Sequence, residues 1–133
     1  MVELSKAEER FLIRNELGRL ATVSPDGTPH VVPVSYIYRA GKLLVATDYT
    51  TKKYRNLRAN DRVAFVVDVF RPNRGILVQG KGRIVEAGPE FQEAYRLFYE
   101  RFSWVRADPW KEREAPFIVM EPTKKMSWGL RSG

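Results

Sequence analysis

The chain has 133 residues, no cysteine, one histidine and 23 Lys plus Arg against 16 Asp plus Glu, a formal net charge of +7. This length predicts one domain, residues 1–133, and the 44% hydrophobic content argues against disorder. Without cysteine there is no disulfide framework, zinc finger or thiol nucleophile, and His30 alone cannot form a multi-histidine metal site. We therefore expect any enzymatic chemistry to come from a cofactor.

The first predicted element is a helix over about residues 5–17. Ser5 and Glu8 have the spacing of a capping box, in which each side chain accepts a hydrogen bond from the other residue's backbone N–H. Phe11 and Leu12 follow on one apolar stripe, and Gly18 is a plausible stop.

The apolar period then changes to two, which predicts three antiparallel strands over 19–24, 28–38 and 42–47. Pro-Asp-Gly at 25–27 supplies the turn chemistry between the first two strands. Pro33 cannot donate a ladder hydrogen bond, so we expect a bulge or a sheet edge at that point.

The remainder of the chain alternates between predicted helices and strands, with a polar loop that carries Trp104 and Trp110. The predicted elements are a helix over 52–59, strands over 62–70 and 76–86, a helix over 89–102, the loop 103–114, a strand over 115–121 and a seventh strand over 126–130. The fold class is mainly β with peripheral helices. Six or seven antiparallel strands predict a barrel, which removes exposed edges.

One segment favours anion binding. Thr47 and Thr51 stand between a strand end and a helix that opens with Lys52 and Lys53. Hydroxyl groups, free backbone N–H groups and the positive end of the helix dipole all favour a phosphate there. The alternative is a capped helix start with a solvated basic face.

The second predicted strand is another candidate. Pro33 would bend the strand and free a carbonyl of its neighbour, so that a planar heterocycle could meet main-chain groups. An ordinary bulged strand is the alternative. His30 at the start of this strand is interpreted as a partly exposed structural residue, and Trp104 and Trp110 as walls of a pocket or an interface.

Taken in order, these segments resemble the pyridoxamine 5'-phosphate oxidase-like FMN-binding split-barrel family. The resemblance covers about residues 5–125 and rests on Leu20–Val23, Asp26–Val34, Gly41–Thr47, Thr51–Leu57, Asn60–Ala64 and Val78–Glu86. It implies a homodimer of six- to seven-stranded antiparallel split barrels, with a flavin in clefts between the subunits. It places the flavin ring along Val32, Pro33, Val34 and Ser35, and the phosphate on Thr47, Thr51, Lys52 and Lys53.

Three departures separate this chain from pyridoxamine phosphate oxidases proper. Val32 stands where those enzymes carry an arginine for the flavin phosphate. Gly75 stands near the position of a glutamine that contacts the ring, although Gln79 lies on the same strand. The segment Met126–Arg131 lacks their substrate-binding arginine–histidine pattern. The resemblance therefore implies a flavin-dependent oxidoreductase with FMN, an unknown small-molecule substrate and unassigned catalytic residues.

Several alternatives stay open. An F420-dependent reductase would suit a basic chain, because the F420 tail is acidic. A non-catalytic flavin carrier or sensor would suit the missing substrate pattern. Haem on His30 is a third option, and non-specific nucleic-acid binding through basic charge is a fourth. No specific nucleic-acid partner and no membrane partner is expected. The N-terminus shows no signal peptide and no apolar run approaches a membrane span of ~20 residues, so we expect a cytoplasmic protein.

Overall fold

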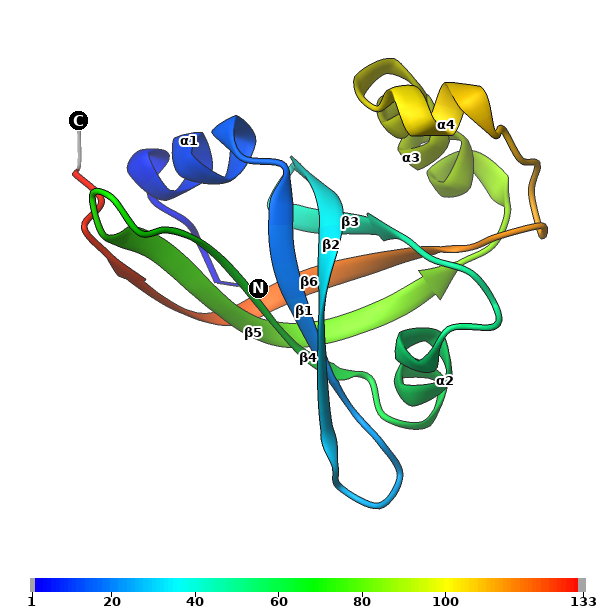
Figure 1. Cartoon of the computed structure of the whole chain (residues 1–133), viewed down its shortest axis with the longest axis horizontal. Helices are drawn as coiled ribbons and strands as arrows, with labels where there is room; N and C mark the ends of the chain where they lie inside the picture. Colours follow the sequence, from blue (N-terminus) through cyan, green and yellow to red (C-terminus); the bar gives the residue numbers. More distant parts are fainter. Residues whose placement is uncertain (1, 132–133) are drawn as a thin grey trace.

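The computed structural model describes residues 2–131 as one barrel with four helices around it (Figure 1). The helices are α1 (Lys6–Arg14), α2 (Lys52–Ala59), α3 (Gly88–Arg101) and α4 (Ser103–Ala107). The strands are β1 (Leu17–Val23), β2 (Pro29–Arg39), β3 (Lys42–Ala46), β4 (Arg62–Val69), β5 (Arg74–Val85) and β6 (Phe117–Trp128).

All strand pairs are antiparallel, and the barrel closes in the order β1-β2-β3-β6-β5-β4. The mainly β fold class and the antiparallel barrel are confirmed. β5 and β6, each 12 residues long, pair along nearly their whole length and form the back of the barrel.

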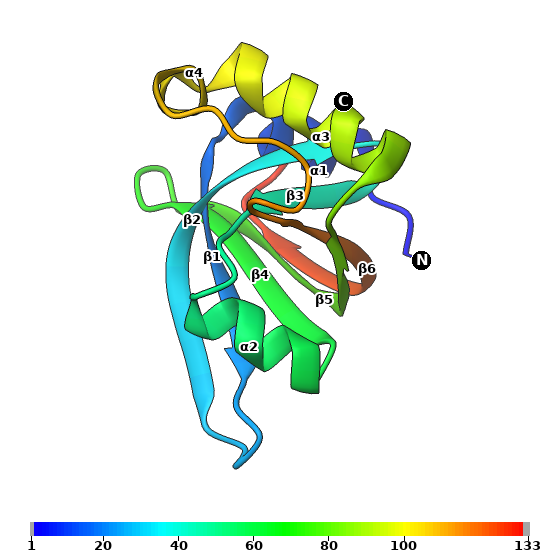
Figure 2. The same ribbon diagram turned by 90° about the vertical axis from the view of Figure 1, so that its right-hand side faces the viewer.

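Strand alternation divides the apolar side chains into two buried clusters. Leu20, Tyr36 and Phe65 belong to the cluster that fills the barrel. Phe98 and Phe117 belong to the second cluster, which packs between the outer side of β3 and β6 and the helices α3 and α4. Figure 2 shows these two helices on one side of the barrel and α2 on the other.

The first helix is shorter than predicted, and Gly18 does not end it. α1 stops at Arg14, where the Asn15 side-chain amide donates to the Phe11 carbonyl at 2.8 Å. Gly18 lies inside β1 instead, and a Cβ there would come within 2.3 Å of the Phe65 ring. The glycine is needed for close packing in the barrel, not for a helix C-cap.

The predicted seventh strand is wrong, because β6 runs unbroken from Phe117 to Trp128. The ladder between β5 and β6 shifts register at Gln79/Gly80, and Thr123 is the extra residue on β6. This bulge carries the strand past Pro122. The loop 103–114 also contains an unpredicted element, since residues Ser103–Ala107 form α4 around a fully buried Val105.

Candidate functional site

β2 changes partner along its length, and this leaves part of it unpaired on one side. Residues 29–35 pair with β1, whereas residues 36–39 pair with β3. Within the described chain, the first half of β2 is therefore an open sheet edge. The edge predicted at Pro33 is confirmed, but the bulge is not, because the β1–β2 register runs without a shift.

The hydrogen-bond phase of β2 shows which main-chain groups face the open side. Tyr36 N–H donates to Glu16 O at 3.0 Å, and Ser24 N–H donates to Thr28 O at 2.9 Å. Even-numbered residues of β2 thus direct their main chain to β1, so Val31, Pro33 and Ser35 direct theirs to the open edge. Pro33 therefore costs the β1–β2 ladder no bond, and it does not free a carbonyl of β1.

The chain that follows β3 forms the other side of this opening. If the β2–β3 register continued, Ser35 would pair with Ala46 and Val34 with Thr47. The ladder ends instead, and Thr47 N–H donates to Pro116 O at 3.2 Å, on the side away from β2. The two predicted halves of the site, residues 32–35 and 47–53, consequently flank the same split in the barrel.

The two threonines of the predicted phosphate segment bond to each other. Thr51 caps α2 by accepting from Tyr54 N–H at 3.3 Å, and its hydroxyl donates to Asp48 O at 3.0 Å. Thr47 Oγ1 lies 2.8 Å from Thr51 Oγ1, and Thr47 is the donor whenever the single hydroxyl hydrogen of Thr51 is directed to Asp48 O. In this arrangement neither hydroxyl is available to donate to an anion.

The donors that remain at the start of α2 belong to two lysines. The backbone N–H groups of Lys52 and Lys53 occupy the first two positions of the helix, where no partner exists within the helix. The first turn contains no acidic residue. Burial lowers the pKa of the half-buried Lys53 ammonium, and nearby Asp48 opposes that shift. An anion here would meet N–H donors and two ammonium groups.

α2 is fixed in place by a residue that sequence analysis did not single out. Asn56 is buried, and its side-chain amide donates to the buried Thr22 hydroxyl of β1 at 3.1 Å. In the sequence, Asn56 could have been recognised as a polar residue on the apolar face of a short helix, next to Leu57. This bond sets the position of Lys52 and Lys53 relative to the sheet.

The side chains along the open edge alternate between core and surface. Val32 lies opposite Leu20 and packs against the barrel core, and Val34 is itself part of that core. Pro33 lies opposite Arg19 on the outer face and is exposed. A ligand at this edge would thus meet main-chain groups more than charged side chains.

Gln79 does not join the other predicted residues within one chain. It lies on β5, separated from β2 by β1 and β4. Its side chain is exposed, and it lines a different hollow of about 400 Å³ together with Arg62 and Lys81.

The two loop tryptophans do border the split. Trp104 and Trp110 line a hollow of about 410 Å³ together with Thr47 and Asp48. Their rings are nearly parallel, at 8°, with centroids 6.4 Å apart. Trp110 is held by its indole N–H, which donates to Ala115 O at 3.1 Å. The hollow therefore adjoins the segment where β2 and β3 separate.

His30 is partly buried, as predicted, and its Nδ1 has no hydrogen-bond partner. Over residues 2–131 there is no group of three or more His, Cys, Asp or Glu arranged to hold a metal ion. None of the helices described is long and apolar enough to cross a bilayer.

The comparison with protein families agrees with this geometry. The family model described as pyridoxamine 5'-phosphate oxidase matches residues 4–125. The chain belongs to this family.

Similar structures span nearly the whole chain. A conserved hypothetical protein from Mycobacterium tuberculosis is 25% identical, with a TM-score of 0.78 over 96% of this chain and 86% of that one. A structure described as an F420 reductase is 28% identical, with a TM-score of 0.71 over 92% of this chain and 98% of that one.

A curated relative matches over a shorter stretch. It is the 5a,11a-dehydrotetracycline/5a,11a-dehydrooxytetracycline reductase of Streptomyces rimosus subsp. rimosus, 43% identical over 68 residues. The match covers 48% of each protein, so this chain spans about half the length of that relative.

Proposed function

We propose that this member of the family is an oxidoreductase that binds a phosphate-bearing flavin, FMN, in the split between β2 and the segment 47–53. The observation that carries the proposal is the register of the β2–β3 ladder, which separates the strands where the open edge faces the start of α2. The reductases among the similar proteins support the oxidoreductase class.

In this proposal, Lys52 and Lys53 hold the phosphate through their backbone N–H groups and ammonium groups. Main-chain groups of Val31, Pro33 and Ser35 orient the ring. A bound flavin supplies the hydride or electron transfer to a small molecule. The hollow beside Trp104 and Trp110 is the proposed substrate position, since it adjoins the split and offers two indole rings for an apolar contact.

The outer face of the barrel supports the proposed homodimer. Leu17, Val31 and Met126 are 53%, 63% and 60% exposed. The registers place Val31 in one outward-facing row with Ala21, Ala64 and Gln79. A second copy seated on this face would bring Gln79 close to the other subunit's split, which is how Gln79 would take part in the cofactor site.

A second candidate cofactor is F420, favoured by the F420 reductase that is 28% identical over 92% of this chain. A side-by-side titration separates the two cofactors. We expect FMN to bind with a dissociation constant in the micromolar range or below, corresponding to about −8 kcal/mol or better.

The phosphate assignment is tested with riboflavin, which has the same ring and no phosphate. Replacing both lysines (Lys52→Gln and Lys53→Gln) should weaken FMN binding at least about tenfold, because charge-assisted bonds to the phosphate are lost, and leave riboflavin unaffected. A charge-matched control is Lys6→Gln with Lys111→Gln, two exposed lysines outside the site.

Fluorescence quenching of the flavin gives the affinities. Failure of the wild-type protein to bind either FMN or F420 would overturn the proposal. Binding without turnover across a panel of reductants and acceptors would support the carrier or sensor alternative over the enzyme.

A further inference from the structure

A third hollow, apart from those at Gln79 and at the two tryptophans, lies at the end of the barrel that carries the N-terminal helix. It has a volume of about 610 Å³ and is bounded by one face of α1, the connection between β4 and β5, and the chain after β6. Among its lining residues are Arg10, Arg14, Arg74 and Arg131. We call it the arginine pocket.

The described walls of this pocket carry basic side chains and no acidic ones. Over residues 2–131, Arg14, Arg74 and Arg131 form no ion pair. Like charges held together in this way repel one another, which favours the presence of a counter-ion.

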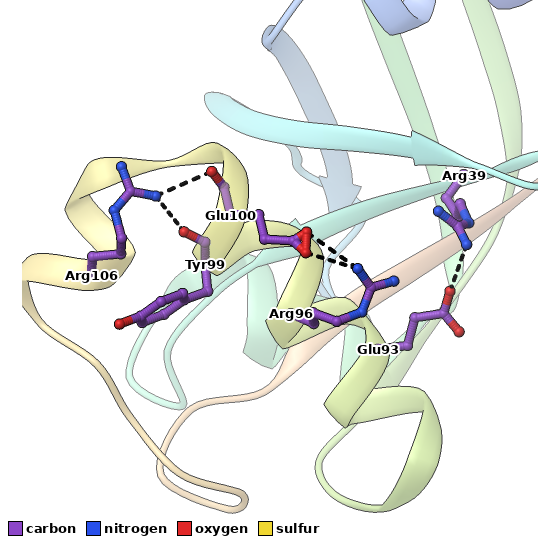
Figure 3. A network of polar contacts seen from close by, with 6 residues as sticks. All are labelled: Arg39, Glu93, Arg96, Tyr99, Glu100 and Arg106. Atoms are coloured by element: carbon purple, nitrogen blue, oxygen red, sulfur yellow. Dashed lines mark hydrogen bonds and ion pairs between the residues drawn. The ribbon is translucent and has the colours of Figure 1, made fainter.

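Some other surface arginines of the chain behave differently. On and beside α3, Arg39 pairs with Glu93 at 3.1 Å and Arg96 pairs with Glu100 at 2.9 Å (Figure 3). Arg106 donates to the main-chain carbonyls of Tyr99 and Glu100 in the same view. The charges of Arg39 and Arg96 are thus matched by a neighbouring carboxylate, whereas several other arginines, Arg62 and Arg71 among them, form no ion pair within residues 2–131. What distinguishes the arginine pocket is that its arginines line one hollow with no acidic residue among the described walls.

Arg74 supplies a second, independent observation. Its Nε atom is buried and has no hydrogen-bond partner, while its guanidinium lies over the Phe11 ring at 5.7 Å from the centroid. A buried donor without a partner costs free energy unless a ligand or solvent molecule satisfies it. The contact with Phe11 holds the guanidinium against α1, at the wall of the pocket.

We propose that the arginine pocket binds a multiply charged oxyanion, either a phosphate group or a polycarboxylate. Guanidinium groups present paired N–H donors that match the oxygens of both groups. Attraction to the helix dipole explains Arg14, which lies in the last turn of α1, but it does not explain Arg74 or Arg131.

This site is separate from the proposed cofactor site within one chain. α2 leads into the start of β4, whereas the β4–β5 connection follows its end. β4 has 8 residues, so the two ends are about 25 Å apart. Figure 1 shows α1 and the β4–β5 connection on one side of the molecule and α2 on the other.

Calorimetric titration at constant ionic strength tests the proposal, with inorganic phosphate and citrate as probes and chloride as the background ion. We expect saturable binding of at least one probe. The double variant Arg14→Gln with Arg74→Gln should weaken it at least about tenfold, since bidentate charge-assisted bonds are removed. The matched control, Arg39→Gln with Arg96→Gln, removes the same charge and should leave binding within about twofold.

Binding by phosphate alone, or by citrate alone, identifies which oxyanion the pocket accepts. Absence of saturable binding, or equal weakening by both double variants, would overturn the proposal. If thermal unfolding shows that the pocket variant does not fold, Arg131→Gln at the exposed chain end must weaken binding instead. FMN affinity of the pocket variant is measured in parallel, so failure here is distinguishable from failure of the proposed function.

Discussion

Glu8 carries more interactions than its place in a capping box requires. Its carboxylate accepts from Ser5 N–H at 2.8 Å, from Lys125 Nζ at 2.7 Å and from Ser127 Oγ at 2.7 Å. The residue is only 5% exposed. One side chain therefore caps α1 and ties it to β6, near the end of the chain.

Replacing this carboxylate by an amide (Glu8→Gln) should destabilise the protein by about 1–3 kcal/mol, because the partly exposed Lys125 ammonium and the Ser127 hydroxyl lose a charged acceptor that is itself buried. Urea denaturation followed by tryptophan fluorescence measures the change. The exposed Glu3→Gln provides the control and should stay within about 0.5 kcal/mol of the wild type. Equal effects of the two substitutions would contradict the assignment.

The same residue makes a pH-dependent contribution to stability. Burial alone would raise the pKa of Glu8, but the bonds from Lys125, Ser5 and Ser127 outweigh it and hold the pKa below its ordinary value of 4.5. The stabilisation is thus complete above pH 4.5 and is lost as the pH falls through the lowered pKa. The stability difference between wild type and Glu8→Gln should shrink over that acidic range.

Sequence alone predicts which residues lie at a site better than it predicts which of their donor atoms are free to bind a ligand. The capping box of Ser5 and Glu8 is confirmed by both hydrogen bonds. Thr47 and Thr51 are close together, as the phosphate prediction requires, but their hydroxyls bond to each other and to Asp48 O. Such mutual satisfaction depends on the path of the chain between β3 and α2, which residue spacing does not specify.

At the scale of elements, the position of α2 depends on a polar contact within an apolar layer. Removing the Asn56–Thr22 bond should let the helix shift relative to β1. Asn56→Ala should lower stability by about 1–3 kcal/mol, because the Thr22 hydroxyl loses its donor in a buried position. FMN binding should weaken with it, since Lys52 and Lys53 begin this helix.

A double-mutant cycle with Thr22→Val isolates the bond from the loss of volume. Thr22→Val removes the acceptor, so Asn56→Ala should cost less in that background. Additive effects would show that the two side chains do not act together. The readouts are the free energy of unfolding from urea denaturation and the FMN dissociation constant.

Capping and turn residues predict the boundaries of elements in this chain well. The continuity of a long strand is predicted poorly. The boundaries of α2 match the prediction, because Thr51 and Asn60 are residue types that cap helices. The prediction of two strands over 115–121 and 126–130 is wrong, because the Pro-Thr-Lys-Lys run at 122–125 resembles a break while β6 continues through it. The bulge at Thr123 needs only the partner strand β5 to accommodate it.

At the scale of the whole molecule, the exposed apolar outer face predicts self-association. We expect a mass of twice 15.4 kDa in sedimentation equilibrium at micromolar concentration. Val31→Asp should weaken the dimer at least about tenfold, since an unpaired carboxylate would be buried between two copies. Ile13→Asp, at an apolar residue on α1 that is 52% exposed, should leave the mass unchanged. A monomeric wild-type protein would contradict the homodimer.

Sites formed by segments that are distant in the sequence could not be predicted from the sequence. The +7 net charge is visible in the composition, but the arginine pocket combines α1, the β4–β5 connection and the chain after β6. The resemblance makes Gln79, on the fifth predicted strand, a cofactor-binding candidate together with residues 32–35, and only the strand order shows that β1 and β4 stand between β5 and β2.

The orientation of Pro33 has a consequence for the behaviour of the protein during folding and storage. An open strand edge is a template on which other chains can add strands and aggregate. Here the edge offers N–H groups at Val31 and Ser35 but none at Pro33, midway between them. A foreign strand would find its ladder interrupted there, so a proline on the open edge protects the split against runaway strand addition.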